Sequence, residues 1–162
     1  MVILPDDRWR FAFGVSLESL AGIADAWKPL VEPAVPVGIS EILTTSRRLF
    51  VHSWFVYEFM VVACLVAIQA VEATCREVVY PQSKARDSFQ SLFGRAAREA
   101  RIPPRLAPQI SPTPDARYAL PELRNRLAHP GFQASYTIGM AAPIMEASHR
   151  IVSLLVASVG QN

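Results

Sequence analysis

The feature that most constrains the fold is a stretch from about Glu41 to Val79, which is dense in apolar residues and contains neither proline nor glycine. Because strands in globular proteins are far shorter, a stretch of this length favours helix. At about 100° per residue, the polar side chains between Tyr57 and Glu77 share a sector of roughly 60°, and apolar side chains cover the remainder. These polar residues are Glu58, Gln69, Glu72 and Arg76. We therefore expect a central helix that is buried nearly all round and carries one narrow polar stripe.

The same stretch could also be interpreted as a membrane span. Its longest run without a charged residue, Phe59 to Val71, has thirteen residues and includes Gln69. A bilayer span needs about 18 to 20 apolar residues, so the sequence favours a helix buried in a protein core and predicts no membrane partner. A small membrane-associated helical protein is the less favoured interpretation of this stretch.

Further helices are predicted on both sides of the central one. Before it, residues 1–38 hold four prolines and one helix between about Ser16 and Lys28, with Ser16 as its N-cap. After it, three helices are expected: an amphipathic one over Ala85–Ala100, a short one opened by Pro121 and ended by Pro130-Gly131, and a last one from Pro143 to Gly160.

The fold class that follows is all-α, an antiparallel bundle of four to five helices, because the only strand signal is a modest one at Ala134–Ile138. A chain of 162 residues with 51% hydrophobic residues is long and apolar enough for one core. We expect a proline-rich N-terminal arm over residues 1–40, packed on a helical domain over residues 41–162.

Cysteine and histidine spacing bears on compartment and cofactors. Cys64 and Cys75 are eleven residues apart on one predicted helix, which separates them by roughly 16 Å and excludes a disulfide between them. The three histidines show no metal-ligand spacing with either cysteine, and no signal peptide is apparent. The sequence therefore predicts a cytoplasmic protein without a metal or other cofactor.

The charge of the chain says little about nucleic acid, because the net value is only +2. Arginines nevertheless line the polar face of the helix predicted over Ala85–Ala100, at positions 86, 95, 98 and 101. A solvated helix face is the simpler interpretation. If the substrate is RNA, then Arg95, Arg98 and also Arg126 are the candidates for phosphate contacts.

The candidate catalytic residues lie on the short helix, where Arg124, Asn125 and His129 occur within six residues. Asn125 and His129 are four apart and nearly stacked, so the amide can orient the imidazole, and Arg124 reaches it from the side. One histidine cannot readily serve as both acid and base in a turnover. An isologous dimer through this helix would bring two imidazoles and two guanidiniums together.

Such a constellation suits metal-independent RNA transesterification to a 2′,3′-cyclic phosphate. One histidine would remove the 2′-hydroxyl proton, the other would protonate the leaving 5′ oxygen, and the arginines would stabilise charge on the phosphorus centre. The simpler alternative is that these residues only cap a helix.

Residues Leu123 to Pro130 resemble the Arg-Asn-x-x-x-His signature of the HEPN family, and the segments Ser46–Phe59 and Gly139–Pro143 are also similar to its uncharacterised bacterial branch. The resemblance spans about Ser46 to Val159. It implies an antiparallel helical core, a homodimer, and RNA cleavage by Arg124 and His129 with Asn125 at the polar position. It also implies a toxin-like or antiphage role, restrained by an antitoxin partner.

Two points stay open from the sequence. Glu58 or Glu72 could face the short helix and pair with Arg124 or orient His129; a surface pair of Glu72 with Arg76 is the simpler role for Glu72, and Glu58 is kept as a supporting residue. The HEPN family also contains members without catalysis, so the alternative function is a helical dimerisation module that binds another protein or a nucleotide.

Overall fold

The computed structural model describes residues 4–12, 14–103, 119–129 and 136–160, and these ranges contain six α-helices and no strand. The all-α prediction is therefore confirmed. The helices are α1 (Leu17–Ala26), α2 (Val37–His52), α3 (Phe59–Ala73), α4 (Phe89–Arg98), α5 (Ala119–Leu127) and α6 (Ile138–Val159). Short 3-10 helices, η1 (Asp7–Phe11) and η2 (Lys28–Leu30), flank α1.

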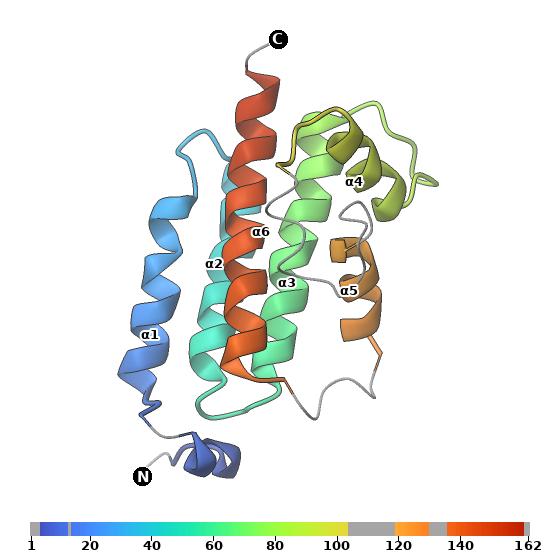
Figure 1. Ribbon diagram of the computed structural model, residues 1–162. Coiled ribbons are helices and arrows are strands. Elements are labelled where there is room, and N and C mark those ends of the chain that lie inside the picture. Colours follow the sequence, from blue (N-terminus) through green and yellow to red (C-terminus); the bar gives the residue numbers. More distant parts are fainter. Residues whose placement is uncertain (1–3, 13, 104–118, 130–135, 161–162) are drawn as a thin grey trace.

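Helix α3 forms the centre of the molecule, as its sequence predicts. Helices α2 and α6 lie alongside it, α1 lies on the outer side of α2, and α4 and α5 lie on the opposite side of α3 (Figure 1). Eight of its fifteen residues are buried, and Gln69 on the predicted polar stripe is its one exposed residue. The apolar character of α3 is explained by these neighbours, which surround it on nearly every side.

The long apolar stretch is divided into two helices by a break at residues 53–58. The sequence prediction of one continuous helical stretch, and with it the count of four to five helices, is wrong at this point. Aromatic and β-branched residues 54–57 are weak helix formers. The N-terminal segment stabilises the break, because the Trp9 indole donates to the Ser53 carbonyl at 2.7 Å and the Asp6 amide donates to the Trp54 carbonyl at 2.9 Å.

At its far end α3 widens into a π-helical segment, η3 (Thr74–Val79), where the Tyr80 amide donates to the Cys75 carbonyl at 2.9 Å. Cys64 and Cys75 are both buried and unbridged. Burial raises the pKa of the Cys75 thiol to about 12. Both sulfurs therefore behave as core atoms rather than as reactive thiols.

The N-terminal region is part of the core. Helix α1 begins after Ser16, whose side chain accepts from the Ser19 amide in a capping box, as the sequence predicts for the N-cap. Leu20 and Ala24 are buried, and the Trp27 ring lies 4.9 Å from that of Phe50. The boundary expected at residue 40 falls inside α2, which begins at Val37.

Helix α4 is shorter than predicted, because it starts at Phe89 rather than Ala85. Ser88 caps it by accepting from the Ser91 amide, and the Asp87 carboxylate accepts from the Lys84 amide to hold a turn before it. Its end is a Schellman turn, in which the Arg101 amide donates to the Ala96 carbonyl and Ala100 has a φ of 55°.

Helix α6 begins at Ile138, five residues before the predicted start, and Pro143 lies inside it. Proline at this position removes one intrahelical hydrogen bond. Burial of the flanking Ala141 and Ile144 against the core outweighs that loss. Of the modest strand signal at Ala134–Ile138, residues 134 and 135 lie outside the described residues and Ile138 is helical.

Two helices in the described part of the chain are long and apolar enough to cross a membrane, judged by length and composition: Phe59–Val79 and Ile138–Val159. In the fold, 56% and 61% of their most apolar windows are buried. Core helices of soluble proteins pass the same test, so this is weak support for the membrane interpretation.

Candidate functional site

Helix α5 lies beside α3 (Figure 1) and packs on it. Leu120 and Leu127 are each 1% exposed. Pro121 lies in its first turn, as the sequence predicts. The helix ends at Leu127, and the His129 amide donates to the Arg126 carbonyl at 3.1 Å in a closing turn. His129 therefore lies two residues past the end of the helix, while Pro130 and Gly131, predicted to end it, lie outside the described residues.

Arg124 is held at the surface by an acid from the central helix. Its Nη2 lies 3.6 Å from Oε2 of Glu72, and its Nη1 donates to Oδ1 of Asn125 at 3.4 Å. The Glu72 side chain is only 18% exposed, whereas that of Arg124 is 39% exposed. The Glu72 carboxylate therefore restrains the Arg124 guanidinium on the side that faces α3, and the other side of the guanidinium stays open to a ligand.

Glu72 also contacts Arg76, whose Nη2 lies 3.3 Å from Oε1 of the same carboxylate. The sequence favoured this second contact as the sole role of Glu72. The structure shows both contacts, so one carboxylate joins the polar stripe of α3 to the short helix. The position of Glu72 on that stripe was the signal available in the sequence.

His129 and Asn125 are both exposed. Their side chains, both within the described residues, are not joined by a hydrogen bond; the Asn125 amide oxygen accepts from Arg124 instead. The imidazole and the amide are thus accessible to solvent, and the guanidinium beside the amide is partly so. Orientation of the imidazole by Asn125, as expected from the sequence, is not formed in the isolated chain.

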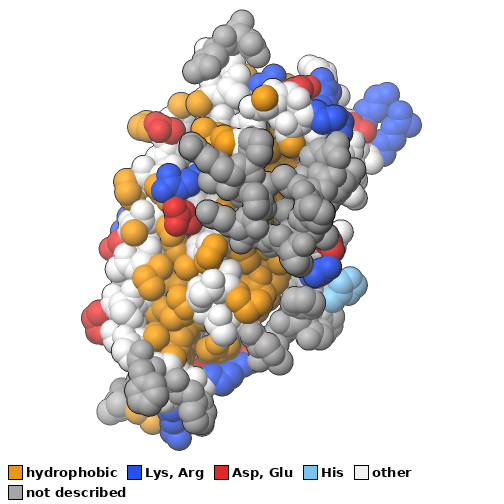
Figure 2. Space-filling model, in the orientation of Figure 1, with side chains coloured by type: hydrophobic (Ala, Val, Ile, Leu, Met, Phe, Trp, Pro, Cys, Tyr) orange, Lys and Arg blue, Asp and Glu red, His pale blue; other side chains and the backbone are white. Residues whose placement is uncertain are grey.

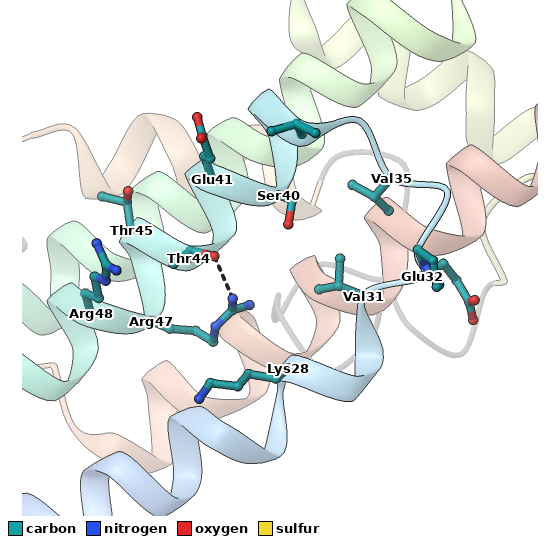
Figure 3. Close-up of a pocket in the computed structure, with 12 residues that line it drawn as sticks. Lys28, Val31, Glu32, Val35, Ser40, Glu41, Thr44, Thr45, Arg47 and Arg48 are labelled. Carbon is teal, nitrogen blue, oxygen red and sulfur yellow. Dashed lines mark hydrogen bonds between the residues drawn. The ribbon is translucent and has the colours of Figure 1, made fainter.

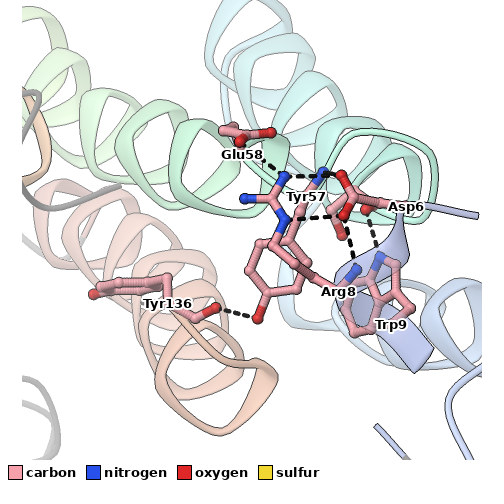
Figure 4. Close-up of polar contacts among 7 residues, drawn as sticks. Asp6, Arg8, Trp9, Tyr57, Glu58 and Tyr136 are labelled. Carbon is pink, nitrogen blue, oxygen red and sulfur yellow. Dashed lines mark hydrogen bonds and ion pairs between the residues drawn. The ribbon is translucent and has the colours of Figure 1, made fainter. Parts of the chain in front are cut away.

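Glu58 lies in a different part of the molecule. Its carboxylate is 2.8 Å from Nη2 of Arg8 (Figure 4). Glu58 precedes Glu72 by fourteen residues, which is about 21 Å along a helix. Arg8 also pairs with Asp6, and the ion pair lowers the pKa of Asp6 well below its usual range. Glu58 therefore supports the N-terminal segment and makes no contact with Arg124 or His129.

The same network reaches the start of α6. The Arg8 guanidinium lies 4.6 Å from the centre of the Tyr57 ring, and the Tyr57 hydroxyl donates to the Tyr136 carbonyl at 2.6 Å (Figure 4). Tyr136 is the first described residue after the Arg124–His129 region. The N-terminal segment, the α2–α3 break and the beginning of α6 are thereby fixed to one another.

Two of the three arginines that the sequence offers for RNA contacts have local acidic partners. Arg95 pairs with Glu99 at 2.8 Å and lies over the Tyr80 ring, while Arg126 pairs with Glu122 one turn away. Arg98 lies near the end of α4. These surroundings are typical of solvated helix faces and leave the three guanidiniums accessible to phosphate.

A broad apolar area covers the lower middle of one molecular face, where α3 and α6 lie (Figure 2). Met140 at the start of α6 is 46% exposed.

In the described ranges, no three His, Cys, Asp or Glu side chains come together as a metal-binding group. No family model, curated protein or solved structure matches the chain.

Proposed function

We propose that this protein is a metal-independent endoribonuclease of the HEPN type that acts as a cytoplasmic homodimer. The observation that carries the proposal is the accessibility of two residues at the end of α5, a restrained Arg124 and an exposed His129 five residues later. Both residues can meet a substrate without any rearrangement of the core.

The proposed reaction uses two copies of that surface. His129 of one copy removes the 2′-hydroxyl proton, and the 2′ oxygen attacks the adjacent phosphorus. The bond to the 5′ oxygen breaks, and His129 of the second copy supplies the proton that this oxygen takes up. The two Arg124 side chains stabilise the additional charge on the phosphoryl oxygens. The products are a 2′,3′-cyclic phosphate and a 5′-hydroxyl end.

The homodimer is supported by the apolar area over α3 and α6, since exposed apolar areas of this kind often mark protein contacts (Figure 2). Dimerisation through α5 would place the two catalytic pairs beside one axis. A toxin-like or antiphage role, restrained by an antitoxin protein, is part of the proposal and follows from the resemblance in the sequence.

The decisive experiment incubates unstructured RNA with purified protein in EDTA at near-neutral pH. Cleavage with 2′,3′-cyclic phosphate ends is expected for the parent, and loss of cleavage is expected for His129→Ala and Arg124→Ala. His52→Ala is the matched control, because His52 is also an exposed histidine at a helix end. Intact RNA with the parent, or equal cleavage by His129→Ala, would refute the proposal.

A non-catalytic dimerisation module is the second candidate. The contact of Arg124 with Glu72 favours it, because this arginine already has a role in holding α5 on α3. It predicts that Arg124→Ala changes dimer stability or partner binding, measured by sedimentation, while neither protein turns over RNA.

A further inference from the structure

A second polar region lies away from α5, where the segment after α1 passes alongside α2. A cavity of about 660 Å³ lies there, and a smaller hollow of about 380 Å³ shares Lys28, Thr44, Arg47 and Arg48 with it. We call the two together the α2 groove. Basic side chains reach it from both walls, Lys28 from η2 and Arg47 from α2 (Figure 3).

Arg47 is the unusual member of this groove. Its Nη2 donates to the Thr44 hydroxyl at 2.8 Å, whereas its buried Nη1 has no hydrogen-bond partner. In the described part of the chain no carboxylate oxygen lies within 4.0 Å of this guanidinium. A half-buried cation with no carboxylate in direct contact is costly, so an anion supplied from outside would stabilise it.

The surrounding groups do not neutralise Arg47. Asp25 is occupied by Lys28 at 2.7 Å, and the carboxylates of Glu32 and Glu41 point away from Arg47 (Figure 3). The charge of Arg47 also acts on the buried His149. Burial lowers the pKa of His149 to about 4, so this imidazole is neutral at physiological pH. Asp25 acts on Arg47 only at a distance, so the groove keeps a positive centre that no described carboxylate contacts directly.

The wall of the groove is fixed before any ligand arrives. Ser153 of α6 accepts from the Glu32 amide at 3.0 Å and donates to the Leu30 carbonyl at 2.8 Å, which holds the segment between η2 and α2. Three hydroxyl groups of α2 also line the groove, from Ser40, Thr44 and Thr45. A guanidinium held by Thr44, together with hydroxyls on a fixed wall, matches the several oxygens of a phosphate group.

We propose that the α2 groove binds a small phosphorylated molecule, with its phosphate on Arg47 and Lys28 and near the Thr44 hydroxyl. The cavity is larger than a phosphate ion, and Val31, Val35 and Val37 line its remainder. The ligand is therefore a phosphate monoester with an apolar portion, of the size of a nucleoside monophosphate. This site shares no residue with α5 and does not depend on ribonuclease activity.

The test measures binding by calorimetry at constant ionic strength, with inorganic phosphate, AMP and adenosine as probes. AMP is expected to bind more tightly than inorganic phosphate, and adenosine is expected not to bind. Arg47→Gln should weaken AMP binding at least tenfold, and Lys28→Gln several fold. Arg150→Gln, which changes an exposed arginine paired with Glu146 on α6, should bind AMP as the parent does.

Thermal unfolding in phosphate-free buffer tells a ligand role of Arg47 from a structural one. If the guanidinium awaits an anion, Arg47→Met is as stable as the parent or more stable, because an unpaired buried cation has been removed. A stabilising shift with AMP is expected for the parent and not for Arg47→Met. Absence of AMP binding by the parent, equal binding by Arg47→Gln, or equal binding of adenosine would overturn the proposal.

Discussion

The buried imidazole of His149 should make the protein lose stability below neutral pH. Its side chain is fully buried, its Nδ1 lies 2.7 Å from the Met145 carbonyl, and its ring lies 5.9 Å from that of Trp27. Burial is the main cause that lowers its pKa from 6.5 to about 4, and the charge of Arg47 acts in the same direction. The folded state therefore keeps this imidazole neutral where the unfolded chain takes up a proton.

The sign and size of the effect follow from this difference in proton binding. As pH falls below 6.5, the unfolded state binds the proton first, so the free energy of unfolding decreases. The loss is about 2 kcal/mol between neutral pH and about pH 5, and it levels off once the folded state also titrates. Acidic groups whose pKa is lowered by folding, such as Glu99, also lose stabilising free energy as pH falls, but they do so below the range in which His149 acts.

Urea unfolding followed by tryptophan fluorescence at several pH values measures this loss. His149→Gln removes the titrating group, so its stability, although lower at neutral pH, should vary little between pH 7 and about pH 5. His52→Gln is the control and should keep the slope of the parent, because His52 is exposed. A parent protein whose unfolding free energy is constant over this range would refute the reasoning.

Three further outcomes are expected. Ala100→Gly should raise the unfolding free energy by about 0.5 to 1 kcal/mol in urea, because Ala100 has a φ of 55° that glycine adopts without strain. Trp9→Phe should lower it by about 1 to 2 kcal/mol, because the hydrogen bond to the Ser53 carbonyl is lost inside the core. Cys64 and Cys75 should react with a thiol reagent only after urea unfolds the chain, because both are buried.

The parts of the fold that could be predicted are those set by local sequence. The Ser16 cap and the buried character of α3 depend on residues within a few turns, and both are confirmed. The break at residues 53–58 could not be found in this way, because Trp9, forty-four residues earlier, supplies the hydrogen bond to Ser53. The start predicted for the last helix at Pro143 is wrong for a related reason. Packing against distant residues outweighs the local preference of proline for the first turn of a helix.

The candidate site shows the same limit. Leu120 and Leu127 occupy the inner face of α5, so the sequence pattern alone indicates that the polar residues between them face outward. What the pattern leaves undetermined is the partner beneath them, because the spacing of Glu72 on α3 suits Arg76 as well as a neighbouring helix. Only the docking of α5 brings the second guanidinium, that of Arg124, within 3.6 Å of the same carboxylate. Since Glu72 is shared by two cations, neither is fully neutralised, and Arg124 keeps positive charge for an incoming phosphate.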